Sequence, residues 1–347
     1  MKFTHTKIPL MAPVQSLSWL DDSLIDWAGG CAKYHLDGSS ARSQIAWGYG
    51  FDAAAQSSSG RFAVIYKKLG TKALLLDGPK IIRELNRSFY CAEAYEYPVV
   101  LFTGPDGREL IAHCPDEYCQ LEIEDLLTGT RLTASKDRKP ADFFHSRLAV
   151  SPGSRRLLSA GWVWHPLDCI SVYDLQAALT DAKTLDPAEA LGVKIDCEVN
   201  AAAFTTGGAL VLAANSEADD FENEGASNLK PGQIGRWCFE TGTFLSVCSY
   251  QGKTGALMPL GEDHVVSFFG HPKLIDLSTG LIVQEWPEIE SGHQSSSIIG
   301  KDVRFPSMAF DIAKRRFAVA SEKLIHVIEC IPRSQPPSSK ATASLLA

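Results

Sequence analysis

The sequence predicts an all-β protein, a seven-bladed β-propeller in which a strand from the N-terminus closes the last blade. Three observations lead to this fold class. A unit of short apolar segments, separated by turns that contain Gly, Asp or Ser, recurs along most of the 347 residues. Segments with the periodicity of a helix are almost absent. The last copy of the unit is one strand short, and residues 2–10 have the length and the apolar content to supply that strand.

The clearest copy of the unit spans residues 255–287. It contains apolar segments at 255–260, 264–269, 273–277 and 281–286, which we predict to be four strands. Turns at 261–263, 270–272 and 278–280 separate them, and each turn contains a glycine. Four short strands joined by tight turns form one antiparallel sheet, which is the blade of a propeller.

Seven copies of this unit give a ring of blades. The predicted blades are 14–46, 51–85, 89–132, 143–183, 198–248, 255–287, and 303–330 completed by 2–10. Closure of the ring by an N-terminal strand removes the exposed edge of the last sheet. We therefore predict a single domain over residues 1–330 and a disordered Pro/Ser-rich tail at 331–347.

Two connections differ from the short turns of the repeat. Residues 175–191 are rich in Ala and carry Leu175, Leu179 and Leu185, so we predict a helix between blades. Residues 217–231 are long and polar, and we predict a mobile insert there.

Turns of one kind follow several predicted strands, as in Asp-Leu-Ser-Thr-Gly at 276–280 and Glu-Thr-Gly at 240–242. In these turns and in the repeat, the chain resembles the WD-repeat-like propellers, over nearly its whole length. The Gly-His turn and the Trp-Asp strand ending of that family are mostly missing. The resemblance implies the ring, its closure by a terminal strand, and a role as an interaction platform. It assigns no catalytic residue.

The acidic balance of the chain, with a formal net charge of −8, bears on its partners. No dense run of Lys and Arg forms the basic stripe of a nucleic-acid-binding protein, so we expect no nucleic-acid partner. An acidic chain is repelled by an anionic membrane surface and attracted by a basic protein. We therefore expect another protein with a basic surface as the partner, no membrane binding, and a monomer in the absence of that partner.

The expected location is the cytoplasm. The sequence contains no run of 18 apolar residues, the length that a membrane span needs, and residues 1–10 lack the apolar core of a signal peptide. The nine cysteines are odd in number and irregularly spaced, which favours reduced thiols over a disulfide framework.

Few motifs carry chemistry. Neither Gly-x-Ser-x-Gly nor a phosphate-binding glycine loop occurs. His113, Cys114 and Cys119 could give zinc three ligands, but no second ligand pair follows, and we expect a strand–turn–strand with core cysteines. Glu122 and Glu124 alternate along a strand and are expected to point outward into solvent. No cofactor and no metal are expected.

Two segments are candidate binding patches. Residues 161–168 place Trp162 and Trp164 two positions apart, before His165, so that both indoles face one way. Tryptophan is enriched in interface hot spots, although ordinary packing between blades would also use it. The insert at 217–231 carries an acidic stretch around one aromatic residue, which could dock a basic groove or be solvated without a partner. Its candidate residues are Asp219, Asp220, Phe221, Glu222 and Glu224, and their spacing does not match a calcium-binding EF-hand loop.

The function that fits these features is a non-enzymatic, protein-binding scaffold or adaptor that uses loops at the rim of the propeller. One alternative is an immunity protein that neutralises a toxin by binding it directly. A second is a propeller enzyme, a lyase or a glycoside hydrolase, with an active site at the channel mouth. That alternative needs carboxylates and histidines that converge from at least three blades.

Overall fold

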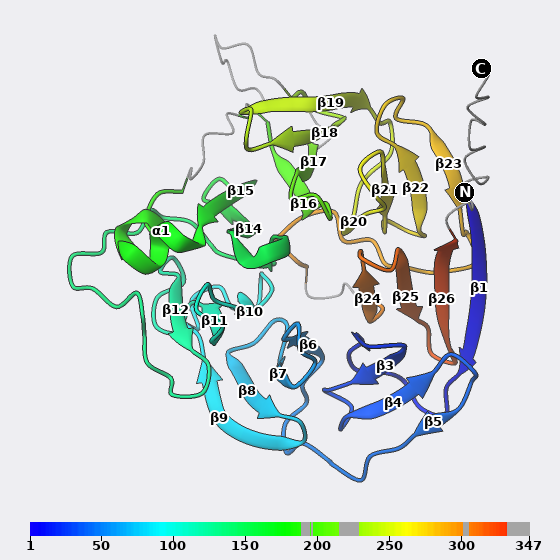
Figure 1. Cartoon of the computed structure of the whole chain (residues 1–347), viewed down its shortest axis with the longest axis horizontal. Coiled ribbons are helices and arrows are strands. Elements are labelled where there is room, and N and C mark those ends of the chain that lie inside the picture. Colours follow the sequence, from blue (N-terminus) through cyan, green and yellow to red (C-terminus); the bar gives the residue numbers. More distant parts are fainter. Residues whose placement is uncertain (189–194, 196, 215–228, 301–304, 332–347) are drawn as a thin grey trace, which may run out of the picture.

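The structure is a computed structural model that describes residues 1–188, 195, 197–214, 229–300 and 305–331. Figure 1 shows its seven antiparallel sheets arranged around a central axis, which confirms the predicted seven-bladed β-propeller. Over the described residues, five sheets have four strands and two have three. Consecutive strands pair within each blade, so each blade is a meander that runs from the axis to the circumference.

The blades follow one another along the chain. The strands of blades 1 to 3 are β2 (Ser18–Leu20), β3 (Ser23–Asp26), β4 (Ala32–His35), β5 (Ser40–Ala41); β6 (Ala53–Gln56), β7 (Phe62–Tyr66), β8 (Lys72–Asp77), β9 (Lys80–Asn86); and β10 (Val99–Thr103), β11 (Glu109–His113), β12 (Glu122–Asp125). Those of blades 4 and 5 are β13 (Ala149–Val150), β14 (Arg156–Val163), β15 (Leu167–Asp174); and β16 (Val199–Phe204), β17 (Leu210–Ala214), β18 (Gln233–Cys238), β19 (Thr243–Ser249). Those of blades 6 and 7 are β20 (Leu257–Pro259), β21 (His264–Ser267), β22 (Lys273–Asp276), β23 (Ile282–Glu285); and β24 (Met308–Asp311), β25 (Arg316–Ala320), β26 (Leu324–Ile331), β1 (Lys2–Pro9).

The core lies between neighbouring blades. Strand β7 has the sequence Phe-Ala-Val-Ile-Tyr, and all five side chains are buried. Because side chains alternate along a strand, Phe62 and Val64 pack toward blade 3, whereas Ala63 and Ile65 pack toward blade 1. Both faces of a blade are therefore covered, which is why the middle strands are continuous apolar runs.

The ring closes as predicted. Strand β1 pairs antiparallel with β26, from Lys2 opposite Ile331 to Pro9 opposite Leu324. The Phe3 ring lies 5.2 Å from that of Trp286 on blade 6, in an edge-to-face contact. The N-terminal strand thus supplies the outermost strand of blade 7 and covers the edge of its sheet.

The predicted helix at 175–191 is wrong in its length. Helix α1 covers only Leu175–Thr180, and a 3-10 turn, η2, follows at Ala182–Leu185. The break comes at Asp181, which has an extended backbone and accepts a hydrogen bond from the Lys183 backbone N–H. Figure 1 shows α1 at the outer side of blade 4, whose described sheet has three strands.

One connection crosses the middle of the ring. The chain between β23 and β24 leaves blade 6 and reaches the opposite side of the axis (Figure 1). There Ile298 forms a bridge with Tyr95, and the Ile299 N–H donates to the Ala94 carbonyl at 2.7 Å. The Ser297 hydroxyl donates to the Gly161 carbonyl at 2.9 Å. We call residues 291–300 the central strap, because they tie blade 6 to blade 4 and to the link that enters blade 3.

The predicted acidic patch (Asp219, Asp220, Phe221, Glu222 and Glu224) lies outside the described residues, as does 332–347 of the predicted tail. None of the helices in the described ranges has the length and apolar character that a membrane span requires.

Candidate functional site: an aromatic cluster on the connector rim

Each blade presents two sets of loops, one on each rim of the ring. In an antiparallel meander, the turn between the second and third strands and the link to the next blade lie at the same end of the sheet. We call this face the connector rim. Around blades 2 to 4 it consists of the turns 67–71, 114–121 and 164–166 and the links 87–98 and 133–148.

Five aromatic residues from these segments and one from the end of β14 form one group on the connector rim, which we call the rim aromatic cluster: Tyr90, Tyr95, Tyr118, Phe144, Trp164 and, from β14, Trp162. The Phe144 ring is stacked between Tyr118, at 4.3 Å, and Trp162, at 3.7 Å. Trp164 packs edge-on against Phe144 at 5.5 Å and against Trp162 at 5.1 Å. Stacked and edge-to-face pairs at these distances are favourable contacts between aromatic rings.

The backbone of β14 creates the stack. Trp162 and Phe144 exchange two backbone hydrogen bonds, of 2.9 and 3.2 Å, which place their side chains together. Gly161 makes this approach possible, because a Cβ atom there would lie 1.9 Å from the Phe144 carbonyl oxygen. The tight turn that follows holds His165 at a positive φ of 99°.

The two tryptophans of the predicted patch therefore have different surroundings, although they share one cluster. Trp162 is 3% exposed and fills the interior, whereas Trp164 is 45% exposed. Tyr90, from the link 87–98, is 43% exposed, and its neighbour Phe89 is 83% exposed. Large aromatic side chains gathered at a surface are typical of binding sites. The exposed part of the patch is thus Trp164, together with Phe89 and Tyr90, which the sequence did not single out.

A buried arginine holds the link that carries Tyr90. Arg87 donates from Nη2 to the carbonyls of Ala92, at 2.6 Å, and Tyr95, at 2.9 Å, and from Nε to Gly70 at 2.7 Å. Its guanidinium lies 4.4 Å from the centre of the Tyr95 ring. Burial lowers the pKa of Arg87, and the carbonyl oxygens and the ring compensate the charge. The arginine fixes the loop from which Phe89 and Tyr90 project.

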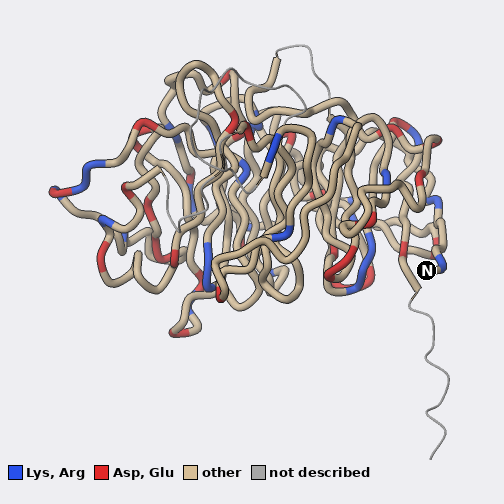
Figure 2. Tube along the Cα trace, turned by 90° about the horizontal axis from the view of Figure 1, so that it is seen from above, with Lys and Arg blue, Asp and Glu red and all other residues tan. Residues whose placement is uncertain are grey.

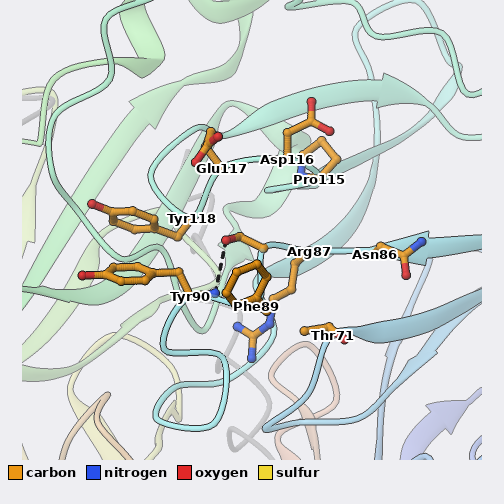
Figure 3. A pocket seen from close by; sticks show the side chains of 10 residues that line it. Thr71, Asn86, Arg87, Phe89, Tyr90, Pro115, Asp116, Glu117 and Tyr118 are labelled. Carbon is orange, nitrogen blue, oxygen red and sulfur yellow. Dashed lines mark hydrogen bonds between the residues drawn. The ribbon is translucent and has the colours of Figure 1, made fainter.

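A cavity of about 800 Å³ adjoins the cluster. Figure 3 shows its lining, most of which comes from the link after β9 and from the turn between β11 and β12. The rings of Tyr90 and Tyr118 lie side by side there, 5.0 Å apart. The lining residues are Thr71, Asn86, Arg87, Ser88, Phe89, Tyr90, Pro115, Asp116, Glu117 and Tyr118.

Carboxylates dominate the charge at the mouth of this cavity. Asp116 forms a two-pronged ion pair with Arg131, and Glu117 beside it is exposed. The Tyr118 hydroxyl donates to Asp142 at 2.7 Å. Burial and this carboxylate together raise the pKa of Tyr118, which stays a neutral hydrogen-bond donor. In Figure 2, by contrast, basic and acidic residues are interspersed over both rims.

The prediction that Glu122 and Glu124 point into solvent is wrong. They are 2% and 3% exposed. Glu124 contacts Arg83 of blade 2 at 2.7 Å, His113 at 3.1 Å and Arg131 at 3.3 Å. Burial alone would raise its pKa, but these contacts outweigh burial and lower the pKa of Glu124 to about 2.

The same blade contains the cluster that resembled a zinc site. His113 lies against Glu124 instead, and Cys114 is buried in an apolar cluster with Leu121 and Ile123. Within the part of the chain that the structure describes, no group of three His, Cys, Asp or Glu side chains is arranged to hold a metal ion.

The channel wall bears on the enzyme alternative. The innermost strands β2, β6, β10, β13, β16, β20 and β24 carry one carboxylate, Asp311, among their described residues. Asp311 accepts a hydrogen bond from Arg316 Nε at 3.0 Å. The convergence of carboxylates from three blades that a channel enzyme would need is not found on these strands.

Comparison with known proteins does not assign the chain to a family. No model of a known protein family matches the chain, and no curated protein matches its sequence. What the chain shares with the WD-repeat propellers is therefore the seven-bladed architecture.

Proposed function

We propose that the protein is a non-enzymatic binding scaffold that docks another protein on its connector rim, around Trp164, Tyr90 and Phe89. The observation that supports this function is the exposure of three large aromatic side chains beside a cavity on one rim. Such side chains supply most of the binding energy in many interfaces, each contributing about 1.5–3 kcal/mol when fully buried.

The packing of Trp164 and Tyr90 within the cluster also favours binding. Trp164 rests on Phe144 and Trp162, and Tyr90 lies 5.0 Å from Tyr118. Side chains that are already fixed by packing lose little conformational entropy on binding. The charge of the chain favours a partner with a basic surface, because opposite charges accelerate the encounter of two proteins.

The test compares Trp164→Ala and Tyr90→Ala with Leu127→Ala, which removes an exposed apolar side chain in the turn after β12, on the opposite rim. Each variant serves as bait in a lysate of the native cell, and the affinity for the recovered partner is measured by calorimetry. We expect Trp164→Ala and Tyr90→Ala to weaken binding at least about tenfold, because truncation of a hot-spot residue costs more than about 1.4 kcal/mol. Unchanged affinity in both variants, with loss in Leu127→Ala, would place the interface on the other rim.

A further inference from the structure

We propose that the cavity beside the rim aromatic cluster binds an arginine side chain of the partner, whose guanidinium stacks on the exposed ring of Tyr90 and pairs with the carboxylate of Glu117. This inference rests on the proposed function, since it names the chemistry that the connector rim recognises.

The walls of the cavity combine the two kinds of group that recognise an organic cation. Aromatic rings attract a cation to their faces, and Phe89, Tyr90 and Tyr118 line the cavity. Figure 3 shows Asp116 and Glu117 on the turn above the two tyrosines. A planar guanidinium can stack on a ring and bind a carboxylate at its edge at the same time, whereas an ammonium makes only point contacts.

Glu117 is the carboxylate that is free for this role. Its neighbour Asp116 already holds the guanidinium of Arg131 through both oxygens. Among the described residues, no ion pair and no side-chain hydrogen bond engages Glu117, which is exposed at the cavity mouth. The Asp116–Arg131 pair also shows that a guanidinium fits against this turn.

The floor of the cavity does not favour an anion instead. Arg87 lines it, but the residue is only 5% exposed, and its guanidinium donates to backbone carbonyls on several sides. An anion would face the carboxylates of Asp116 and Glu117 without gaining those donors. The charge that an incoming group meets first is therefore negative.

A peptide-borne arginine fits the surroundings better than a free small cation. The cavity, at about 800 Å³, is far larger than one guanidinium. The exposed Phe89 and Tyr90 stand at its edge, where they can pack against the neighbouring residues of an extended segment.

The test uses N-acetyl-arginine amide and its uncharged isostere, N-acetyl-citrulline amide, titrated into the full-length protein labelled with fluorotyrosine. Among the nine tyrosines, Tyr90 and Tyr118 are assigned with Tyr→Phe variants. One side chain held by a ring and a carboxylate binds weakly, with a Kd on the order of 10 mM. We expect the arginine amide to shift the Tyr90 and Tyr118 resonances, and the citrulline amide to shift them at least about fivefold less at equal concentration.

Glu117→Gln should weaken the arginine titration about threefold to fivefold. The matched control is Glu322→Gln, an exposed glutamate in the β25–β26 turn of the same rim, which should change nothing. Three results would overturn the inference: equal shifts by citrulline, no effect of Glu117→Gln, or shifts by a neutral sugar such as maltose and none by arginine. If arginine binds here but Trp164→Ala retains the partner, the proposed function fails and the cavity stands. If Trp164→Ala loses the partner but arginine does not bind, the proposed function stands and the inference about the cavity fails.

Discussion

His5 Nε2 lies 3.0 Å from Nδ1 of His326, which joins the first strand of the chain to the last across the closure of the ring. Lys7 is paired in register with His326, and Glu288 of the link after blade 6 lies 3.5 Å from His5 Nδ1. Burial lowers the pKa of both histidines, and the nearby Lys7 lowers both further, while Glu288 acts in the opposite direction.

The His5–His326 pair predicts that acid destabilises the folded protein where β1 and β26 close the ring. The folded state favours two neutral imidazoles, whereas a histidine of the unfolded chain takes up a proton near its usual pKa of about 6.5. The stabilising contribution is complete above pH 6.5 and is lost as the pH falls through the lowered pKa values of the folded state. We expect the midpoint of urea unfolding to fall between pH 7.5 and pH 5, and to fall less in His326→Gln. His35→Gln, on β4 of blade 1, is the control and should behave like wild type.

Removal of the closing strand should destabilise the entire ring. Deletion of residues 1–10 removes β1 and exposes the edge of β26 and the face of Trp286. Because the blades support one another, we expect a lower melting temperature for the whole domain and aggregation through the open edge. Thermal unfolding followed by circular dichroism measures this, with Lys2→Ala as the control. A wild-type melting curve with fraying of blade 7 alone would contradict the prediction.

Alanine substitutions of Trp162, in β14, and Trp164, in the turn that follows, should show that one ring serves stability and the other serves partner binding. Trp162→Ala empties a buried site and should cost about 3–5 kcal/mol in the free energy of unfolding. Trp164→Ala removes a half-exposed ring and should cost less than about 1.5 kcal/mol, while it weakens partner binding. Equilibrium unfolding in urea gives the first quantity and calorimetry the second. Equal destabilisation by both substitutions would remove the distinction.

Gly161→Ala should disrupt the aromatic cluster through the backbone. The added methyl group would meet the Phe144 carbonyl, so the β14 backbone and the link 133–148 must separate. We expect a loss of about 3 kcal/mol or more in stability, since steric overlap with backbone is not relieved by a side-chain rotation. Gly48→Ala is the matched control, because nothing lies within 4 Å of the position of its Cβ.

Glu124, the buried carboxylate between blades 2 and 3, should contribute to the stability of the folded state down to low pH. Glu124→Ala leaves Arg83 without its close carboxylate partner and should cost about 3–5 kcal/mol. In wild type, the contribution of Glu124 is present above the usual glutamate pKa of about 4.3 and is lost as the pH falls toward a pKa of about 2. Urea unfolding at pH 7 and pH 3 checks both statements. Glu290→Ala, on an exposed pair with His293, should change stability by less than about 0.5 kcal/mol.

The ring was predictable because its signals are local. The turns at 270–272 and 278–280 mark strand ends within a few residues, and the missing strand of the last blade points to residues 2–10. The helix at 175–191 was overestimated, because Leu and Ala spacing does not show that Asp181 adopts an extended backbone.

The site was only half predictable, because its parts come from separate links. Trp162 and Trp164 stand out as neighbours in sequence, and their rings lie 5.1 Å apart, although Trp164 belongs to the turn after β14. Tyr90 and Phe144 come from two different links, and only the packing around blades 3 and 4 brings them together. Glu124 was misassigned for the same reason, since its partner Arg83 lies 41 residues away on another blade.

The pairing of β1 with β26 also determines when the ring can close during biosynthesis. His5 and His326 are 321 residues apart, and a ribosome that adds about 5–20 residues per second needs roughly 15–65 s to make that length. During that interval the first strand of the nascent chain has no partner, and its Phe3 and Ile8 side chains lack the surface that later buries them. The N-terminal segment therefore waits for its pairing strand until β26 has been made, and a chain cut short before β26 cannot close its ring.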